Sequence, residues 1–219
     1  MNAGPLWKEI RLKVLVIIAL FVWIVGFIAL TSFVSALPLE QPISLDPAGT
    51  IDRTIWIPLR ERYSLQLEFS REGHTFEELQ ALIGDPFPPV RAGIPVPIEW
   101  SFTSKTSGEV VANGTSVTEG ASGWGREIWR NVTTIRVAPG RYVFHARVLR
   151  PVPELKSIPT KLALWNSFKT NDTWQSTCIF FGTLFAVWVC GPVLIVFLLL
   201  LGWTLARHWW RLHGGVAQR

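Results

Sequence analysis

Two long runs of uncharged, apolar residues place the strongest limit on what this chain can fold into. The first run covers residues 14–34 and the second covers residues 178–205. A helix rises about 1.5 Å per residue, so about 20 apolar residues cross the hydrocarbon core of a bilayer. Both runs are therefore predicted to form transmembrane helices, and Gly191-Pro192 is the expected place for a kink in the second.

The two runs divide the 219-residue chain into five parts. They are a cytoplasmic N-terminal tail (1–13), transmembrane helix 1 (14–36), an extracytoplasmic domain (37–173), transmembrane helix 2 (174–206) and a cytoplasmic C-terminal tail (207–219). An alternative is open for the first run, because Val34-Ser35-Ala36 would suit a signal peptidase. The run is longer than the roughly 7–15 residues of a signal-peptide core, which favours a retained anchor.

The excess positive charge of the chain lies in its two tails. The net charge is +5, the N-terminal tail has three basic residues and one acidic residue, and the C-terminal tail has three basic residues. The segment between them holds 15 basic and 15 acidic residues. Basic residues collect on the cytoplasmic side of membrane helices. Both termini are therefore expected in the cytoplasm and the middle domain in the periplasm, at a bacterial inner membrane, and binding to nucleic acid is not expected.

The cysteines and the possible glycosylation triplets bear on the compartment. Cys178 and Cys190 both lie in the second apolar run, so the middle domain contains no cysteine with which to form a disulfide. A domain of this size can rely on its core alone, which fits a bacterial periplasm. Asn-x-Thr triplets begin at Asn113, Asn131 and Asn171, and they keep a eukaryotic source open.

Alternating apolar and polar residues predict that the middle domain is built of strands. Residues 62–69 (RYSLQLEF) and 93–102 (GIPVPIEWSF) show the pattern most clearly, and Pro95 and Pro97 place the second at a sheet edge. A capping box at residues 75–78 and a following Gly84 predict one short helix. Further strands are expected at 54–59, 109–111, 130–137, 141–150 and 161–165. The predicted fold is an all-β, immunoglobulin-like β-sandwich with one short inserted helix, flanked by two transmembrane helices.

The motifs of common enzyme classes are missing from the sequence. The segment GASGWG at 120–125 has the wrong spacing for a serine nucleophile elbow. The middle domain has only two histidines, His74 and His145, in different elements, which is too few for a zinc site. There is no phosphate-binding glycine loop and no dinucleotide fingerprint. We therefore predict no catalytic, cofactor-binding or metal-binding residues, no cofactor and no enzymatic activity.

Two segments are candidates for contact with a partner. Glycines surround Trp124 in the segment 113–129, so Trp124, Arg126 and Trp129 are a candidate loop for binding a protein. The alternative is an ordinary hairpin connection with Trp124 folded back on the sheet. In the second apolar run, Gly182, Ala186 and Cys190 recur every four residues, and we expect this face to pack against Gly26 or Ala29 of the first run.

His145 lies inside the segment VAPGRYVFHARVLRPVPELKSIP and raises a separate question. Alternation places it on one strand face with Val143, Arg147 and Leu149, away from Tyr142 and Phe144. No ligand or catalytic partner for it can be identified in the sequence. We therefore expect His145 to be a residue of a sheet surface.

The order of these segments resembles a family of uncharacterised bacterial envelope domains. The resemblance is carried by Arg60-Glu-Arg-Tyr63, Gly93-Ile-Pro-Val-Pro97, Pro139-Gly-Arg-Tyr142 and Pro153-Glu-Leu155, and it covers roughly residues 54–169. It implies a β-sandwich domain that is periplasmic, lipid-anchored or membrane-tethered, and it implies no activity. The two apolar runs depart from the simpler secreted form of this family.

Two hypotheses about function follow. The first is a membrane-anchored periplasmic binding module of the immunity type, which blocks a toxin delivered to the periplasm. The alternative is an accessory or structural subunit of an inner-membrane protein complex. The expected partners are the lipid bilayer and a protein, with no small-molecule cofactor.

Overall fold

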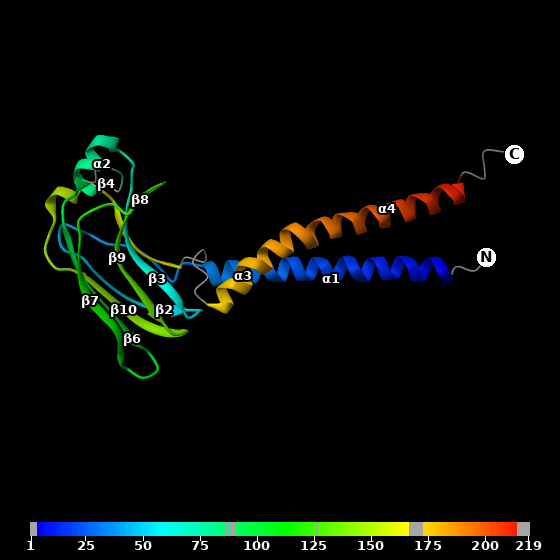
Figure 1. The fold of residues 1–219 in the computed structure, drawn as a ribbon, viewed down its shortest axis with the longest axis horizontal. Coiled ribbons are helices and arrows are strands. Elements are labelled where there is room, and N and C mark those ends of the chain that lie inside the picture. The colour runs from blue at the N-terminus through cyan, green and yellow to red at the C-terminus, as the bar shows by residue number, and fades with distance from the viewer. Residues whose placement is uncertain (1–3, 86, 88–90, 126, 167–172, 214–219) are drawn as a thin grey trace. The chain divides into compact units, whose positions relative to one another are not determined.

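The computed structural model describes residues 4–85, 87, 91–125, 127–166 and 173–213. The chain forms two compact units, a sheet domain at Ser35–Ser176 and a helical unit made of Met1–Val34 and Thr177–Arg219 (Figure 1). The sheet domain consists mainly of antiparallel strands. The coarse expectation of a β-rich domain flanked by two long apolar helices is therefore confirmed.

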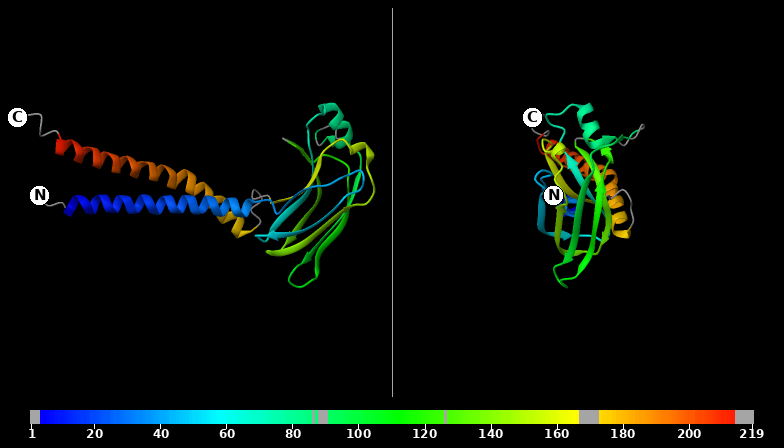
Figure 2. Two further views of the ribbon diagram at one scale, coloured as in Figure 1. Left: turned by 180° about the vertical axis from the view of Figure 1, so that it is seen from behind. Right: turned by 90° about the vertical axis from the view of Figure 1, so that its left-hand side faces the viewer.

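The strands form two main sheets and one short ribbon. Sheet A has the order β1 (Leu39–Pro42), β11 (Thr160–Asn166), β3 (Glu61–Phe69), β9 (Ile128–Val137) and β8 (Gly123–Trp124). Sheet B has the order β2 (Thr50–Ile57), β10 (Gly140–Val148), β6 (Val96–Ser104) and β7 (Val110–Thr118). The ribbon pairs β4 (Gly84–Asp85) with β5 (Arg91–Ala92). Figure 2 shows that the helix α2 (Phe76–Ile83) lies at one end of the strands, opposite the turn between β6 and β7.

One hydrophobic core is shared by the two main sheets. Leu65 and Leu67 of sheet A and Ile98 and Phe144 of sheet B have no exposed surface and belong to the same cluster. Full burial of such a side chain contributes roughly 1.5–3 kcal/mol. The domain contains no cysteine, so this core replaces disulfides as the source of stability.

Strand β6 lies inside sheet B, between β10 and β7, so its expected position at a sheet edge is wrong. Pro95 precedes the strand, and Pro97 is only its second residue. The pairing of β6 with β10 stops at Ile98 opposite Val148, so Pro97 lies beyond that ladder and needs no N–H there. Its carbonyl still accepts from Leu149 N–H at 2.9 Å. A proline at the start of a strand therefore does not require an edge.

The short helix is confirmed as α2, and its N-terminus has the predicted capping box. The Thr75 hydroxyl accepts from Glu78 N–H, and the Glu78 carboxylate accepts from Thr75 N–H. Gly84 ends the helix with a φ of +90°, a conformation that favours glycine. The buried residues Leu79 and Ile83 attach the helix to the core.

The two tyrosines of the chain make the same contact at two strand starts. Tyr63 Oη donates to Leu59 O at 3.0 Å, and Tyr142 Oη donates to Ala138 O at 2.8 Å. Burial raises the pKa of Tyr63 to about 12. Each tyrosine ties the start of its strand to the preceding turn, and two of the family-like motifs end on these residues.

Two segments of the chain are long and apolar enough to cross a membrane, Ile10–Ser35 and Trp174–Trp210. The first lies in α1 (Gly4–Ser35), and the second is formed by α3 (Trp174–Phe185), a π-helical turn (Ala186–Cys190) and α4 (Gly191–His213). Pro192 has no N–H to donate to the preceding turn. The departure from α-helical geometry thus falls directly before the expected kink at Gly191-Pro192.

Phe27 of α1 packs against Gly182, the first residue of the small-residue face of the second segment. A Cβ on Gly182 would lie 2.2 Å from the Phe27 ring, so glycine is required for this close approach. Gly26 has no atom within 4 Å of its own Cβ position, and Ala29 is exposed. The expected packing against Gly26 or Ala29 is therefore wrong. Polar pairs add to the contact, with Lys13 Nζ donating to Thr204 Oγ1 at 2.7 Å and Thr31 Oγ1 lying 3.2 Å from Thr183 Oγ1.

Candidate functional site

Polar side chains cross the outer face of sheet B in a single row. Antiparallel register places Asp52 of β2 opposite His145 of β10, His145 opposite Ser101 of β6, and Ser101 opposite Asn113 of β7. Residues opposite one another on adjacent strands share a sheet face. Four strands that are distant in sequence thus place an acid, an imidazole, a hydroxyl and an amide side by side.

A close contact between His145 and Asp52 lies within this row, and an ion pair lies in the next row. His145 Nδ1 lies 2.7 Å from Asp52 Oδ1, and Arg147 Nη2 donates to Glu99 Oε2 at 2.7 Å. The four side chains are 40–66% exposed, so water and salt screen both pairs. Each pair contributes at most about 1 kcal/mol to folding. We call these four residues, with Ser101 and Asn113, the polar face.

The polar face surrounds an open hollow of about 390 Å³. The lining is completed by Trp100, Gly114 and Thr115. The sheet itself forms the floor, because the side chain of Trp100 points into the core, where a Cβ on Gly114 would come within 2.8 Å of its ring. The hollow therefore offers donors and acceptors of both charges on a rigid base, which suits recognition of a polar or charged group.

The order Asp52, His145, Ser101 follows that of a catalytic triad, but the geometry lacks two requirements of one. Among the hydrogen bonds of the described residues, none joins His145 to Ser101. Ser101 also lies in the middle of β6, between two strands, so neighbouring N–H groups serve the sheet and form no oxyanion hole. The described residues of this row therefore do not form a catalytic triad.

The structure identifies a partner for His145 that the sequence did not suggest. Asp52 lies 93 positions away along the chain, at the start of a strand that was expected to begin only at Thr54. His145 does lie on a sheet face with Arg147, as expected. The pair could be predicted only if the register between β2 and β10 were known.

The candidate loop around Trp124 packs against its own domain. Trp124 is half-buried, contacts the hydrophobic core and lies 4.7 Å from the ring of Phe76 in α2. Trp129 covers Gly123, where a Cβ would come within 2.2 Å of the indole. Arg126 lies outside the described residues. Both tryptophans thus take part in packing, and a role of this loop in binding stays a prediction.

A fully buried arginine, Arg130 of β9, anchors the segment that contains α2. Its guanidinium donates to the carbonyls of Leu82, Ile83, Ile94 and Thr118 at 2.6–3.2 Å. Burial lowers its pKa to about 10, so it remains charged at neutral pH. No sequence pattern marks this residue, because buried arginines are rare and its acceptors are backbone atoms.

The anchor also explains a family-like motif. A Cβ on Gly93 would lie 2.4 Å from Arg130 Nη2 and 2.3 Å from the Ile83 carbonyl carbon, so only glycine fits there. The neighbouring Ile94 contributes its N–H to Leu82 O and its carbonyl to Arg130. The start of the Gly-Ile-Pro-Val-Pro segment therefore holds the arginine in place.

A cluster of carboxylates occupies the outer face of sheet A. Lys161 Nζ lies 3.0 Å from Glu40 Oε1 and 3.4 Å from Glu127 Oε1, while the Trp165 indole donates to the Glu68 carboxylate. Glu68 is 7% exposed, and burial raises its pKa. The described residues contain no group of three or more potential ligands placed to hold a metal ion.

The sequence of residues 40–165 matches a protein family described as a domain of unknown function, DUF5625. The chain belongs to this family. The match covers the strands from β1 to β11 and excludes both apolar segments. The family-like motifs at residues 60–63, 93–97, 139–142 and 153–155 all lie inside it.

The fold is similar to that of a protein from Sulfurospirillum deleyianum whose crystal structure is known. The TM-score is 0.50 at 15% sequence identity, with 59% of this chain and 96% of that chain covered. At this identity the likeness concerns the fold alone. No curated protein matches the sequence.

Proposed function

We propose that this protein is a membrane-anchored periplasmic binding module that recognises another protein through the polar face of sheet B. The observation that carries the proposal is the open hollow of about 390 Å³, which has charged and polar walls on a rigid floor. An open, polar surface on a β-sheet suits a protein side chain better than an enclosed small molecule. The candidate loop at Trp124 and Trp129 is a second, separate surface of the same module.

Localisation is part of the proposal. The two apolar segments, the basic tails and the absence of cysteine from the sheet domain favour a bacterial inner membrane, with both termini in the cytoplasm and the sheet domain in the periplasm. Two sheets around one core, with tyrosines bonded to the preceding turn, favour an immunoglobulin-like β-sandwich. We also propose that the family to which this chain belongs consists of bacterial envelope proteins.

The biological role that fits such a module is an immunity-type protein that blocks a toxin delivered to the periplasm. A tethered binder gains effective concentration at the membrane where a membrane-directed toxin would act. The test uses the full chain in detergent as bait for periplasmic and secreted proteins, with the variant Asp52→Lys/Glu99→Lys as a matched control. Capture by the wild type and loss by the variant support the role, whereas equal capture by both excludes the polar face.

An accessory subunit of an inner-membrane complex is the alternative. It is favoured by the π-helical turn at Ala186–Cys190, since such turns are often found at functional sites. Replacing both apolar segments by unrelated anchors separates the two roles. A binding module keeps its partner after the exchange, and a subunit assembled through its helices loses it.

A further inference from the structure

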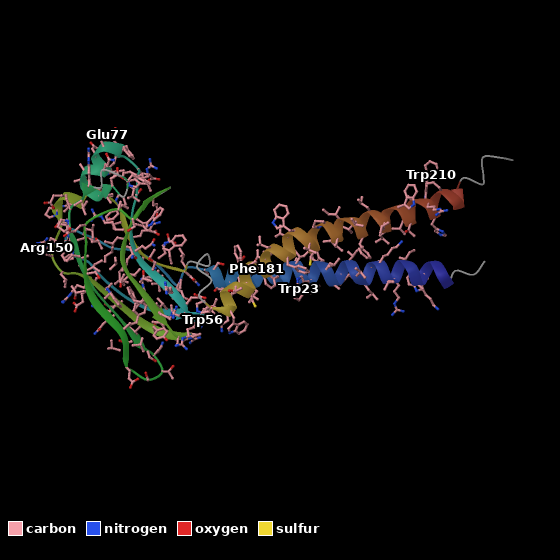
Figure 3. The ribbon with its side chains drawn as sticks, in the orientation of Figure 1. Trp23, Trp56, Glu77, Arg150, Phe181 and Trp210 are labelled. Atoms are coloured by element: carbon pink, nitrogen blue, oxygen red, sulfur yellow. The ribbon has the colours of Figure 1, made fainter. Side chains whose placement is uncertain are left out.

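The two ends of the sheet domain differ in charge. We call one the linker end, because β1 begins and β11 ends there, together with the turns at 58–60, 105–109 and 138–139. Register places these turns at one end, with Ile57 opposite Gly140 and Glu61 opposite Val137. The other, the distal end, carries the described residues of 43–49, 70–95, 119–127 and 149–159, with α2, the ribbon of β4 and β5, and β8 among them. Figure 3 shows Trp56 and Glu77 at these opposite ends.

The charges of each end are those of the described residues in its turns and at its chain entry points, including the two strand residues on either side. The linker end has five basic and three acidic residues: Arg60, Arg62, Lys105, Arg136 and Arg141, against Glu40, Glu61 and Glu109. The distal end has six basic and nine acidic residues. Glu61 is only 1% exposed, whereas all five basic residues are exposed. The chain between the two tails has no net charge, yet the sheet domain is positive at one end and negative at the other.

The arrangement of the basic residues concentrates the charge. Arg62 lies directly opposite Arg136 on sheet A, and the backbone N–H of Lys105 donates to Arg141 O at 2.9 Å beside sheet B. Trp56 is 43% exposed and lies opposite Arg141. Tryptophan beside arginine is the combination favoured in the headgroup region of a bilayer, where rings meet both lipid and water.

Chain connectivity brings this end to a membrane. Only residues 36–38 separate the end of α1 from the start of β1, and three residues extend by little more than about 10 Å. The second apolar segment begins at Trp174, eight positions after the end of β11. Both segments are thus joined to the domain at its positive end.

We propose that the linker end of the sheet domain binds the anionic phospholipid headgroups of the leaflet from which the two apolar segments emerge. The proposal rests on these segments spanning a bilayer, but it does not depend on which protein the polar face recognises. Each basic residue near an anionic surface strengthens binding by a factor of about five. The contact presents the acidic distal end to the periplasm.

The test compares the full chain in nanodiscs of phosphatidylcholine alone with nanodiscs that also contain phosphatidylglycerol. We expect amide hydrogen exchange in the turns at 58–60 and 105–109 to slow at least about fivefold with phosphatidylglycerol at low salt, and the slowing to fade at high salt. Distal amides should not respond. Equal exchange in the two lipids overturns the proposal. The same slowing by inorganic phosphate in phosphatidylcholine discs shows general anion binding and also overturns it.

Charge-reversal variants locate the contact. Arg60→Glu/Arg62→Glu/Arg136→Glu/Arg141→Glu should abolish the response, while the distal control Arg71→Glu/Arg91→Glu/Arg150→Glu/Lys156→Glu, with the same change in net charge, should retain it. If the first variant does not fold, Arg60→Gln/Lys105→Gln changes only turn residues and should reduce the response. A response that both sets of variants retain overturns the proposal.

A separate readout keeps this test apart from the proposed function. Flotation of the full chain with liposomes and its resistance to alkaline extraction report whether the apolar segments are inserted. A chain that is not inserted contradicts the membrane anchor itself. A chain that is inserted, but whose linker end does not respond to phosphatidylglycerol, contradicts only the headgroup contact.

Discussion

Arg130 and Arg147 lie on consecutive strands of the sheet domain, but their side chains have opposite environments. Arg130, on β9 of sheet A, has no exposed surface and donates only to backbone carbonyls. Arg147, on β10 of sheet B, is about half exposed and donates to one carboxylate. The first cation donates to four carbonyls in the interior, where water cannot take its place, while the second can exchange its partner for water. A charge of the first kind stabilises the fold, and one of the second kind is accessible to the proposed partner.

Replacing Arg130 tests this difference most strongly. Arg130→Met should lower the free energy of unfolding by about 3–5 kcal/mol, because the carbonyls of Ile83, Ile94 and Thr118 would lose their guanidinium donor in the interior. Arg147→Met should lower it by at most about 1 kcal/mol. Chemical denaturation of both variants measures the contrast. Similar losses in the two variants would contradict the comparison.

The next largest effect is expected where the anchor meets its glycine. Gly93→Ala forces a methyl group to within 2.4 Å of Arg130 Nη2, so the guanidinium or the backbone at Ile83 must move. We expect a loss of about 1–3 kcal/mol, as is usual for overpacking. Gly120→Ala is the control, since no atom lies within 4 Å of its Cβ position. If Gly93→Ala left the free energy of unfolding unchanged, the surroundings of Arg130 would have to rearrange without loss of stability.

The buried carboxylate of Glu68 and the exposed carboxylate of Glu99 allow the same comparison of stability for negative charges. Burial raises the pKa of Glu68 above that of an unfolded chain, so the folded state holds a proton that the unfolded state loses. The contribution of Glu68 to the free energy of unfolding should therefore fall as the pH rises from the pKa of the unfolded chain through the pKa of the folded chain. Glu68→Gln should raise the melting temperature at pH 7, because its amide oxygen can still accept from Trp165, and the gain should vanish in acid. Glu99→Gln, on the exposed pair, should not show this pattern.

The smallest effect on folding is expected at the polar face. Asp52→Asn should change the free energy of unfolding by less than about 1 kcal/mol, since both side chains of the pair with His145 are exposed. The same substitution should weaken binding of the partner that the wild type captures. Titration of the captured partner against both proteins, together with a melting curve, measures the two effects. A large loss of stability without any loss of binding would assign the pair to the fold.

Local sequence patterns predicted much of the architecture. Alternation identified β3, β9, β10 and β11, and the capping box with Gly84 located α2. These features depend on contacts within a few residues, and such contacts are visible in one segment. The prediction for β7 was too short, because polar residues and Gly114 interrupt its apolar pattern, and the short strands β1, β4, β5 and β8 carried no pattern of their own.

The placement of β6 illustrates where a local rule fails. Two prolines indicated an edge strand, yet the strand begins after the first of them and pairs on both sides beyond the second. Whether a missing N–H matters depends on which residue lies opposite it. That information belongs to the partner strand and not to the proline.

The amino-acid sequence by itself determined the two apolar segments, the charge of the tails, the alternating strands and the capped helix, because each is a property of consecutive residues. Only the tertiary structure decided which residues meet across the sheets. Strand order and register determine the pairing of His145 with Asp52 and the carbonyls to which Arg130 donates. They also determine the close approach at Gly93 and the separation of charge between the two ends. A shift of one residue in register would move these side chains to the other face of the sheet.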